Sequence, residues 1–441
     1  MKNFRRLLKI IKNLFLTLIG LLLIGLLVVF AKPMWRHWVT YPNNQKQVEA
    51  FALRKKECPD VTGLKIYRGV MHLHSYWSHD SKGTINDLVD AAKLRNINFI
   101  FLTDHPHGNL DSFPRGYSRG LYDGVLLEPG SEKQGFDAWP LKDGVVNWNA
   151  NKDSVSKQIV SNGGIVFYAH TEEPHNWANP WYQGMEIYNF HTNVKLKTST
   201  WPILTDFLIN GSKYRAWAYR TIFHRQTGIL AHWDSINIQR KIVGFSAVDE
   251  HENVNFRARY TKDGRIQLMG IDTKPVGIYK VSFWNKWLLD TPDKDGWIFK
   301  WMLVNTYETS FNNSVNYLFA DSLNLNNISH HIVEGHHFTA FKFLADATGF
   351  CYYGAGPDGS MKGMMGDSIK VADLKQLKAI SPYPGRFALI KDGKTLEVTD
   401  GETYQYTFDK PLSKGAYRIE VEVKPGDEWQ PWIYTNPIYL Y

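Results

Sequence analysis

Histidine and carboxylate side chains lie close together at two places near the start of the chain. His72-Leu73-His74 is followed by Asp80, and Thr103-Asp104-His105 comes next along the sequence. In an extended strand, residues two apart point to the same side, so His72 and His74 can bind one ion. Imidazole and carboxylate groups are ligands with which proteins hold zinc, manganese and iron. The two motifs therefore predict a metal site.

The same residue types recur later, each time at the end of a short apolar run. Glu132 and His170 close two such runs, and Asp249 and His251 close a third. Buried His, Asp and Glu residues are uncommon unless they are paired or bind a metal. We therefore predict one metal centre with eight ligands. They are His72, His74, Asp80, His105, Glu132, His170, Asp249 and His251.

These ligands require a scaffold that brings distant strand ends together. Six runs are typical of buried strands, because they are short, rich in β-branched and aromatic residues and often begin at glycine. They span 66–74, 97–105, 124–132, 164–170, 184–190 and 242–251, with helical spacing between them at 84–96, 151–163 and 201–219. Alternating strands and helices predict an α/β fold with a parallel sheet, open or closed into a barrel, and with the ligands at the carboxyl ends of the strands.

The remainder of the chain has a looser pattern. A helix is predicted near 312–333, and alternating strands separated by turn signals follow it to the C-terminus. Short strands of this kind are typical of an antiparallel β-sandwich. The predicted organisation is a basic tail and transmembrane anchor at 1–36, a linker at 37–65, the metal-binding barrel at 66–335 and the β-sandwich at 336–441.

The N-terminal anchor is predicted from an uncharged apolar stretch at 14–31, which follows five basic residues. Such a stretch is long enough to cross a bilayer core of about 30 Å as a helix. The basic residues before it predict a cytoplasmic N-terminus, with the rest of the chain outside the cytoplasm. A cleaved signal peptide has a similar start, but residues 29–31 form a poor cleavage site, so we expect an uncleaved single-pass anchor.

Composition excludes several other classes of protein. The chain has a net charge of +8, and residues 1–36 carry seven basic residues and no acidic one. The remainder is nearly neutral, so we expect no nucleic-acid partner, which would call for a basic surface on the folded part. With 44% hydrophobic and 21% charged residues, the chain is expected to fold. Its two cysteines, Cys58 and Cys351, are too few for a disulfide framework.

Taken together, the motifs resemble the polymerase and histidinol phosphatase (PHP) superfamily of metallohydrolases. The resemblance rests on His-x-His with a downstream Asp, Thr-Asp-His, a Glu after a glycine-rich strand end and a closing Asp-x-His, and it covers about residues 66–255. Residues 184–189 are similar to the Gly-x-Glu-x-x-Asn element of the exported, carbaryl-hydrolase-like branch. The resemblance implies a distorted β/α (TIM-like, PHP-type) barrel with two or three divalent ions, commonly zinc, manganese or iron.

The resemblance also implies how the ions share their ligands. One ion would be held by His72, His74, Glu132 and Asp249, a second by Asp80, His105 and His251, and a further ion by Glu132 and His170. The family supplies one more histidine between Glu132 and His170, whereas this chain has none from 108 to 169. His191 or His175 are candidates to replace it, or else that ion is weak or absent.

Two or three such ions would generate a hydroxide near neutral pH and neutralise charge on phosphoryl oxygens. We therefore expect a membrane-anchored, extracytoplasmic, metal-dependent phosphoesterase of the cell envelope, with His105, Asp80 and His251 as catalytic residues. Its substrate would be a small-molecule or envelope phosphate mono- or diester. Cationic help for the phosphate is a candidate role for three arginines of the long helical insert. They are Arg215, Arg220 and Arg225.

Two other functions remain open from the sequence. The first is a metal-dependent carboxylic-ester, carbamate or amide hydrolase, in which the metal polarises a carbonyl group. The second is a non-catalytic envelope protein that binds a metal or a glycan, and the missing histidine is the feature in its favour.

Overall fold

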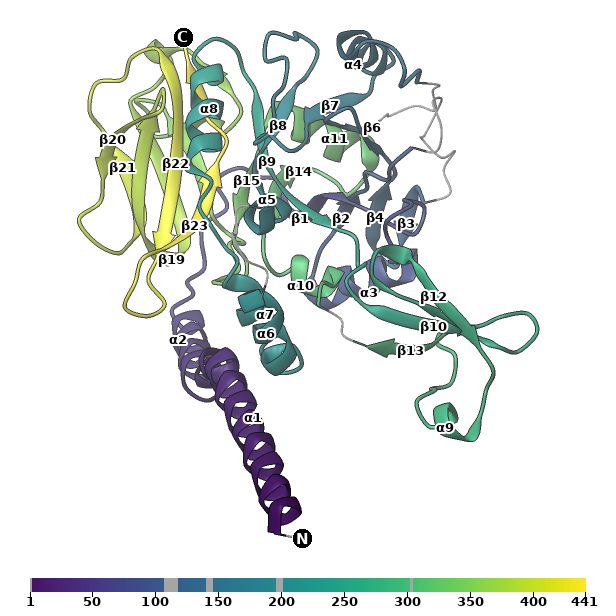
Figure 1. Ribbon diagram of the computed structural model, residues 1–441. Coiled ribbons are helices and arrows are strands. Elements are labelled where there is room, and N and C mark those ends of the chain that lie inside the picture. The colour runs from purple at the N-terminus through teal and green to yellow at the C-terminus, as the bar shows by residue number, and fades with distance from the viewer. Residues whose placement is uncertain (1, 107–117, 140–145, 196–200, 302–303) are drawn as a thin grey trace.

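A computed structural model describes residues 2–106, 118–139, 146–195, 201–301 and 304–441. A large mixed sheet with covering helices forms the body, and one long helix leaves this body at the N-terminus (Figure 1). The expected mixed α/β fold with an apolar N-terminal helix is confirmed at this level.

The long helix is α1 (Lys2–Trp35), which continues through five π-helical residues, Arg36–Thr40, into α2 (Tyr41–Ala52). Leucine, isoleucine and valine side chains along the apolar stretch of α1 are exposed, as on a surface that lipid covers. Within the described part of the chain this is the one helix long and apolar enough to cross a membrane, although a signal sequence would pass the same test.

The inner end of this helix is fixed to α6 (Trp201–Asn210) by polar contacts. Arg36 forms a salt bridge of 3.0 Å with Asp206. Asn210 donates a hydrogen bond of 3.1 Å to the carbonyl oxygen of Pro33, close to the point where α1 ends. The residues predicted as a linker therefore begin with helical turns that are held against the body.

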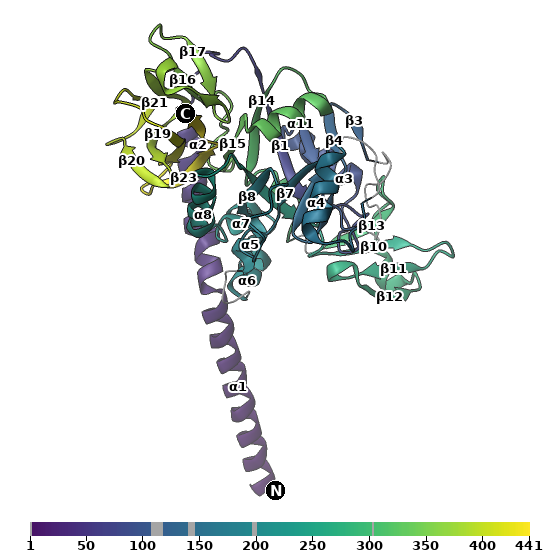
Figure 2. The same cartoon turned by 90° about the horizontal axis from the view of Figure 1, so that it is seen from above.

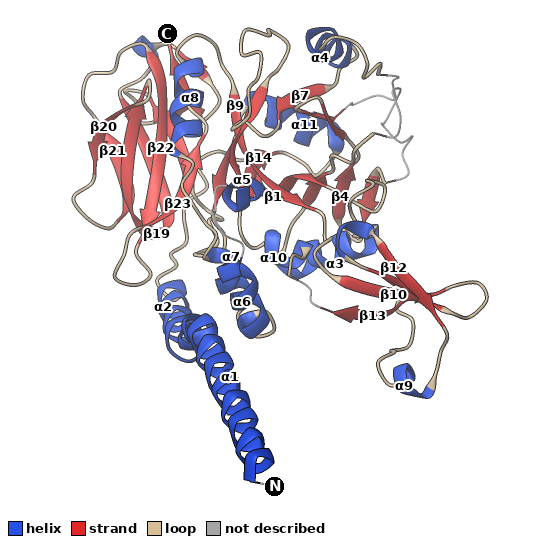
Figure 3. Cartoon of the chain, in the orientation of Figure 1, coloured by secondary structure: helices blue, strands red, loops and turns tan. Residues whose placement is uncertain are grey.

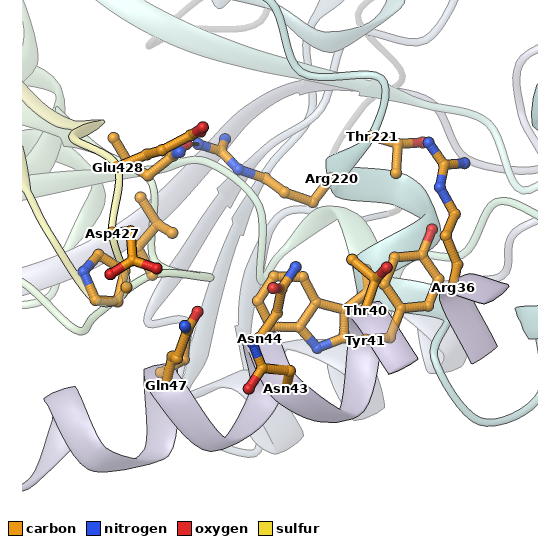
Figure 4. Close-up of a pocket in the computed structure, with 16 residues that line it drawn as sticks. Arg36, Thr40, Tyr41, Asn43, Asn44, Gln47, Arg220, Thr221, Asp427 and Glu428 are labelled. Atoms are coloured by element: carbon orange, nitrogen blue, oxygen red, sulfur yellow. Dashed lines mark hydrogen bonds between the residues drawn. The ribbon is translucent and has the colours of Figure 1, made fainter. Parts of the chain in front are cut away.

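A cavity of about 470 Å³ separates α2 from α7 (Arg215–Arg220) and from the loop before β23 (Gln430–Thr435). Figure 4 shows Arg220 reaching across it from α7, with Asp427 and Glu428 on the loop opposite. Side chains of both charges line this seam, so we assign it no ligand.

Six parallel strands form the centre of the large sheet, in the order β4–β2–β1–β9–β8–β7. Their carboxyl ends meet at one edge, which is where the predicted ligands were expected. Glycine permits the close packing of β1 on β2, since a Cβ atom at Gly69 would lie 1.9 Å from the ring of Phe99. The strands are β1 (Lys65–Leu73), β2 (Phe99–Phe101), β4 (Val125–Glu128), β7 (Ile165–Tyr168), β8 (Gly184–Asn189) and β9 (Val243–Glu250).

Helices connect these strands and cover the sheet (Figures 2 and 3). Thr84 is the capping residue just before α3. Its side chain accepts a hydrogen bond from the Asp87 amide, and the Asp87 carboxylate accepts one from the Thr84 amide. This reciprocal cap, and a left-handed Asn96 after the last turn, explain the bounds that the sequence predicts. The helices around the sheet are α3 (Ile85–Arg95), α4 (Lys152–Ser161), α5 (Phe190–Lys195), α8 (Thr227–Asn237), α10 (Tyr307–Ser310) and α11 (Leu325–Glu334). α4, α10 and α11 also begin after a capping side chain, that of Asn151, Thr306 and Asn324 respectively.

Antiparallel strands extend the parallel core. β3 (Gly120–Tyr122) pairs with β4, β6 (Phe136–Trp139) pairs with β7, and β5 (Ser131–Lys133) pairs with β6. An isolated bridge between Asp104 and Ser131 brings β5 back toward β2. A TIM-like β/α barrel would have a closed ring of parallel strands here. Antiparallel strands and a single bridge are found instead. The large mixed sheet is therefore confirmed, and the expected barrel is not.

The prediction of a helix over 312–333 is wrong for the first half of this segment. β14 (Val315–Ala320) lies antiparallel to β1, and only the second half of the segment forms α11. All six residues of β14 are buried, so their pattern lacks the alternation that identifies a strand with one exposed face.

A four-stranded antiparallel sheet projects from the body between β9 and α10, with strand order β12–β11–β10–β13. The sequence analysis assigns no element here. The sheet is small, and a three-residue cluster of buried apolar side chains forms its core. Its elements are β10 (Phe256–Tyr260), β11 (Ile266–Met269), β12 (Pro275–Tyr279), α9 (Phe283–Lys286) and β13 (Trp297–Trp301).

The C-terminal strands are mostly antiparallel, as the sequence predicts for this part of the chain. The long strand β19 (Gln376–Lys391) pairs with β16 and β21 through its first half and with β20 and β22 through its second half. β15 joins β14 to β23, so the large sheet runs without interruption into these strands. The domain boundary at 336 therefore stays a prediction. The remaining strands are β15 (His337–Ala340), β16 (Cys351–Ala355), β17 (Met361–Met364), β18 (Ser368–Ile369), β20 (Lys394–Val398), β21 (Thr403–Phe408), β22 (Gly415–Val423) and β24 (Ile438–Leu440).

We predict that a buried histidine at this junction makes the fold sensitive to acid. His337 donates a hydrogen bond of 3.0 Å to the carbonyl oxygen of Gly244, and burial lowers its pKa to about 3. The unfolded chain takes up this proton near pH 6.5, so stability falls below that pH by up to about 1.4 kcal/mol per pH unit. His337→Gln keeps a donor for Gly244, so its melting temperature should fall less between pH 7 and pH 5 than that of the wild type. Equal falls in circular-dichroism melts would contradict this assignment.

Candidate metal centre

The ligands of β1 and β9 owe their positions to an irregularity where these two strands pair. One residue of β1, His72 between Met71 and Leu73, lies opposite two residues of β9, Val248 and Asp249. His72 and Asp249 sit at this bulge with φ angles of 55° and 49°, in the left-handed region. His170, just after β7, has a φ angle of 49°. Non-glycine residues in this region cost about 1–3 kcal/mol each and are found preferentially at functional sites.

One group of ligands surrounds the carboxylate of Asp80. The Nε2 atoms of His105 and His251 each lie 3.3 Å from its Oδ2 atom. The ring of His74 stacks on that of His251, with centroids 4.0 Å apart. One donor atom from each of these four residues lies within 4.8 Å of the others.

The second group surrounds Glu132 and Asp249. The Nε2 atom of His72 is 3.5 Å from a carboxylate oxygen of Glu132 and 3.4 Å from one of Asp249. The Nε2 atom of His74 is 3.4 Å and 3.6 Å from the same two oxygens. His170 reaches the other oxygen of Glu132 at 3.3 Å. His74 thus belongs to both groups, and the structure brings all eight predicted ligands together.

The histidine rings are oriented so that Nε2, rather than Nδ1, faces the centre. The Nδ1 atom of His74 is 3.3 Å from the Ser78 hydroxyl, that of His105 is 3.2 Å from the Glu132 carbonyl oxygen, and that of His251 is 3.3 Å from the Asp249 carbonyl oxygen. Partners of this kind fix the tautomer and the ring orientation of metal-binding histidines.

The donor atoms fit a bound metal ion. The Nε2 atoms of His72 and His74 are buried and have no hydrogen-bond partner, which is costly unless another group satisfies them. Two donors that are each about 2.1 Å from one ion in tetrahedral geometry lie about 3.4 Å apart. The separations of 3.4–3.6 Å between these two Nε2 atoms and the carboxylate oxygens of Glu132 and Asp249 agree with that spacing. The clusters therefore fit divalent metal binding.

Electrostatics favour a cation as well. Burial would raise the pKa of Glu132, but the surrounding imidazoles hold it well below its ordinary value. Burial would lower the pKa of His170 and of His251, but neighbouring carboxylates raise these pKa values to about 11 and about 9. The protons that these histidines bind would be exchanged for a divalent ion.

Two buried carboxylates behind His72 are absent from the sequence prediction. An oxygen of Asp137 lies 3.3 Å from the Nδ1 atom of His72, and Glu186 hydrogen-bonds the same nitrogen. Burial raises the pKa of Asp137 to about 7. Asp137 lies on the antiparallel strand β6, away from the parallel strand ends where the sequence directs attention. Glu186 belongs to the Gly-x-Glu-x-x-Asn element, which offered a signal for it.

Of the residues that the sequence analysis left as candidates, His191 lies beside the metal centre, whereas His175 and the three arginines contact other residues. The Nδ1 atom of His191 lies 2.9 Å from Asp249 Oδ2, so this histidine lies beside the centre. His175 instead contacts the carbonyl oxygen of His170 and packs on Tyr168. The contacts of the three arginines are with other residues. Arg215 donates to the Gly211 carbonyl, Arg220 to Gln430 and Arg225 to Glu420.

A cavity of about 560 Å³ opens beside the centre. Its lining includes the ligands Asp80, Asp249 and His251, and also His191. The rest of the lining is mainly apolar. It comes from α5, α6, α7 and Ile222, and from residues 250, 253–254 and 304–305. A substrate at the metal centre would therefore have both polar ligands and an apolar wall within reach.

No family model and no curated protein matches the chain. The chain is similar to the crystal structure of a two-domain protein from Bacteroides vulgatus ATCC 8482, described as containing a predicted PHP-like metal-dependent phosphoesterase. The two chains are 14% identical, the match covers 87% of this chain and 99% of that one, and the TM-score is 0.36. The exported carbaryl-hydrolase-like branch finds no support in it.

We predict that Glu186 raises the affinity for the metal indirectly, because it holds the ligand His72 in position. It hydrogen-bonds His72 and accepts bonds from the His170 amide at 2.8 Å and from Asn189 at 2.9 Å. Loss of such a partner typically weakens metal binding by about 10–100-fold. Glu186→Gln should show this loss in calorimetric titration with Mn²⁺ or Zn²⁺. Glu334→Gln, on a helix surface, is the matched control, and equal affinities for the two variants would refute the role.

Proposed function

We propose that this protein is a metal-dependent phosphoesterase. The observation that supports the proposal is the pair of adjoining ligand groups that share His74, with Asp80 in one group and Glu132 and Asp249 in the other. Two or three divalent ions bound there would supply an activated water and neutralise negative charge on a phosphoryl group. The identity and the number of the ions stay predictions.

The chain's own residues would orient the reacting groups. Asp80, Asp249 and His251 are the ligands that border the cavity, so a phosphate ester entering from the cavity would meet them. His191 is placed to handle a proton. Its Nδ1 atom is bonded to Asp249 Oδ2, and its ring is half-exposed on the cavity wall. We propose that its Nε2 atom donates the proton to the leaving oxygen.

The proposed enzyme works outside the cytoplasm, anchored by α1. The basic residues before the apolar stretch support this orientation, and the contacts between Arg36 and Asp206 hold the body directly at the end of the helix. Its substrate would be a phosphate ester of the cell envelope.

Hydrolysis of a carboxylic ester, carbamate or amide is the second candidate, and one observation favours it. Among the described residues that line the cavity there is no lysine or arginine. A neutral acyl group needs no such partner, whereas phosphate sites commonly contain one. The ions themselves would have to supply the positive charge for a phosphate.

The test is a metal-reconstitution assay on the full chain in detergent. After chelation, Mn²⁺, Zn²⁺ or Fe²⁺ should restore hydrolysis of an aryl phosphate monoester or diester, and His105→Ala should reduce turnover at least about 100-fold because an Asp80 partner is lost. His79→Ala is the control, since His79 is exposed and belongs to none of the ligand groups. Unchanged turnover in His105→Ala would overturn the proposal, and hydrolysis of aryl carboxylic esters alone would select the second candidate.

A further inference from the structure

The cavity beside the metal centre has an apolar wall that the reaction itself does not require. Ile203, Leu204 and Phe207 of α6 form part of this wall, and Val194 and Ile222 continue it. The metal ligands Asp80, Asp249 and His251 line the same cavity. A hydrocarbon group placed along this wall would lose contact with water while its polar end remained at the ions.

The helix that forms this wall also lies where α1 leaves the body. α6 is tied to the end of α1 by the bonds from Arg36 to Asp206 and from Asn210 to Pro33, and the two helices adjoin in Figures 1 and 2. On its outer side, Trp201 is 73% exposed and Leu208 is 59% exposed. Near the end of α1, Trp35 and Trp38 are also exposed, as is typical of tryptophan at the interface between lipid and water.

We propose that the substrate is a bilayer amphiphile whose hydrocarbon chain occupies this cavity, which makes the enzyme a lipid phosphate phosphatase. This inference rests on the proposed phosphoesterase function. In the reaction, water adds to the phosphorus atom and the bond from phosphorus to the lipid oxygen breaks. The lipid oxygen takes a proton, so inorganic phosphate and a lipid alcohol are the products.

The test compares chain lengths on the full chain in phosphatidylcholine nanodiscs with Mn²⁺. The ratio of kcat/KM for dodecyl phosphate to that for ethyl phosphate should exceed about 100, because dodecyl phosphate has a hydrocarbon chain to bury against the apolar wall and ethyl phosphate does not. Leu204→Trp fills the cavity and should lower this ratio at least tenfold, with Leu204→Phe as a milder variant. Leu94→Trp, on the exposed side of α3, is the matched control. A ratio near one, with ethyl phosphate turned over, would overturn the inference and leave the proposed function intact.

A second readout does not depend on turnover. A phosphatidic acid with a diazirine at the end of its acyl chain, irradiated in the same nanodiscs without added metal, should crosslink to peptides of the cavity wall, and Leu204→Trp should reduce this yield. Crosslinks confined to α1 would contradict the inference. If neither ester is hydrolysed although these crosslinks form, the phosphoesterase proposal fails while the chain-binding cavity stands.

The projecting sheet carries a separate apolar surface. Phe283, Trp284 and Trp287 around α9 are 84%, 81% and 77% exposed, and apolar side chains of β12 next to them are also exposed. We name this the α9 surface. Basic side chains accompany it, and residues 271–289 carry three lysines and one acidic residue. The lysines are Lys274, Lys280 and Lys286.

We infer that the α9 surface inserts into the bilayer interface beside the α1 span. Figures 1 and 3 show α9 at the end of the projecting sheet, on the side of the molecule from which α1 emerges. Aromatic side chains prefer the headgroup region, and lysines beside them are attracted to anionic lipid. α1 therefore fixes which surface the α9 aromatics meet.

Spin labels test this contact. In a full chain with Cys58→Ser and Cys351→Ala, a label at Trp284→Cys should collide more with oxygen than with a water-soluble nickel complex in phosphatidylcholine–phosphatidylglycerol vesicles. A label at Val398→Cys, on an exposed apolar position of β20, is the matched control and should show the reverse. Equal access of the nickel complex to both labels would overturn the inference, and so would spin–spin broadening at 284, which would indicate a second copy of the chain.

Discussion

The repulsion between buried carboxylates around His72 is the constraint on which the site depends. Glu132, Asp137, Glu186 and Asp249 approach this one imidazole from four different strands. Each carboxylate is costly in a buried position unless a positive group faces it. The imidazoles meet part of this need by binding protons, and divalent ions would meet it more fully. The strand ends can therefore converge only because cationic groups hold them there.

The arrangement of strands in the sheet brings these carboxylates and histidines together. Parallel strands place most ligands at one edge, but the pairing of β1 with β9 contains the extra residue that turns His72 and Asp249 inward. Antiparallel β6 brings Asp137 from the opposite direction, and β5, which pairs with β6, places Glu132 next to it. A regular barrel would supply only the first kind of ligand. The departure from the expected barrel and the density of carboxylates thus have the same origin.

Much of this arrangement was predictable from residue type and position. Six strands and the ligands at their ends could be recognised because buried parallel strands are apolar runs, and polar residues at their ends stand out. β14 could not be recognised, since no glycine or proline separates it from the helix that follows, and a short apolar run without such a boundary looks like part of a buried helix. Asp137 sits within a strand rather than at its end, and its role depends on a pairing between β6 and β7 that no local pattern encodes. The projecting sheet has too small a core to impose a strong hydrophobic pattern.

The polar contacts at the inner end of α1 attach this helix rigidly to the body. A flexible linker would instead let the body move independently of the helix. Arg36 and Pro33 are bonded to the same helix, α6, which also forms the wall of the cavity. With α1 in a bilayer, the centre would be kept at a fixed height above the lipid, and the proposed enzyme would search for substrate by lateral diffusion in two dimensions. Molecules dissolved far from the surface would be out of reach, whatever their affinity for the metal ions.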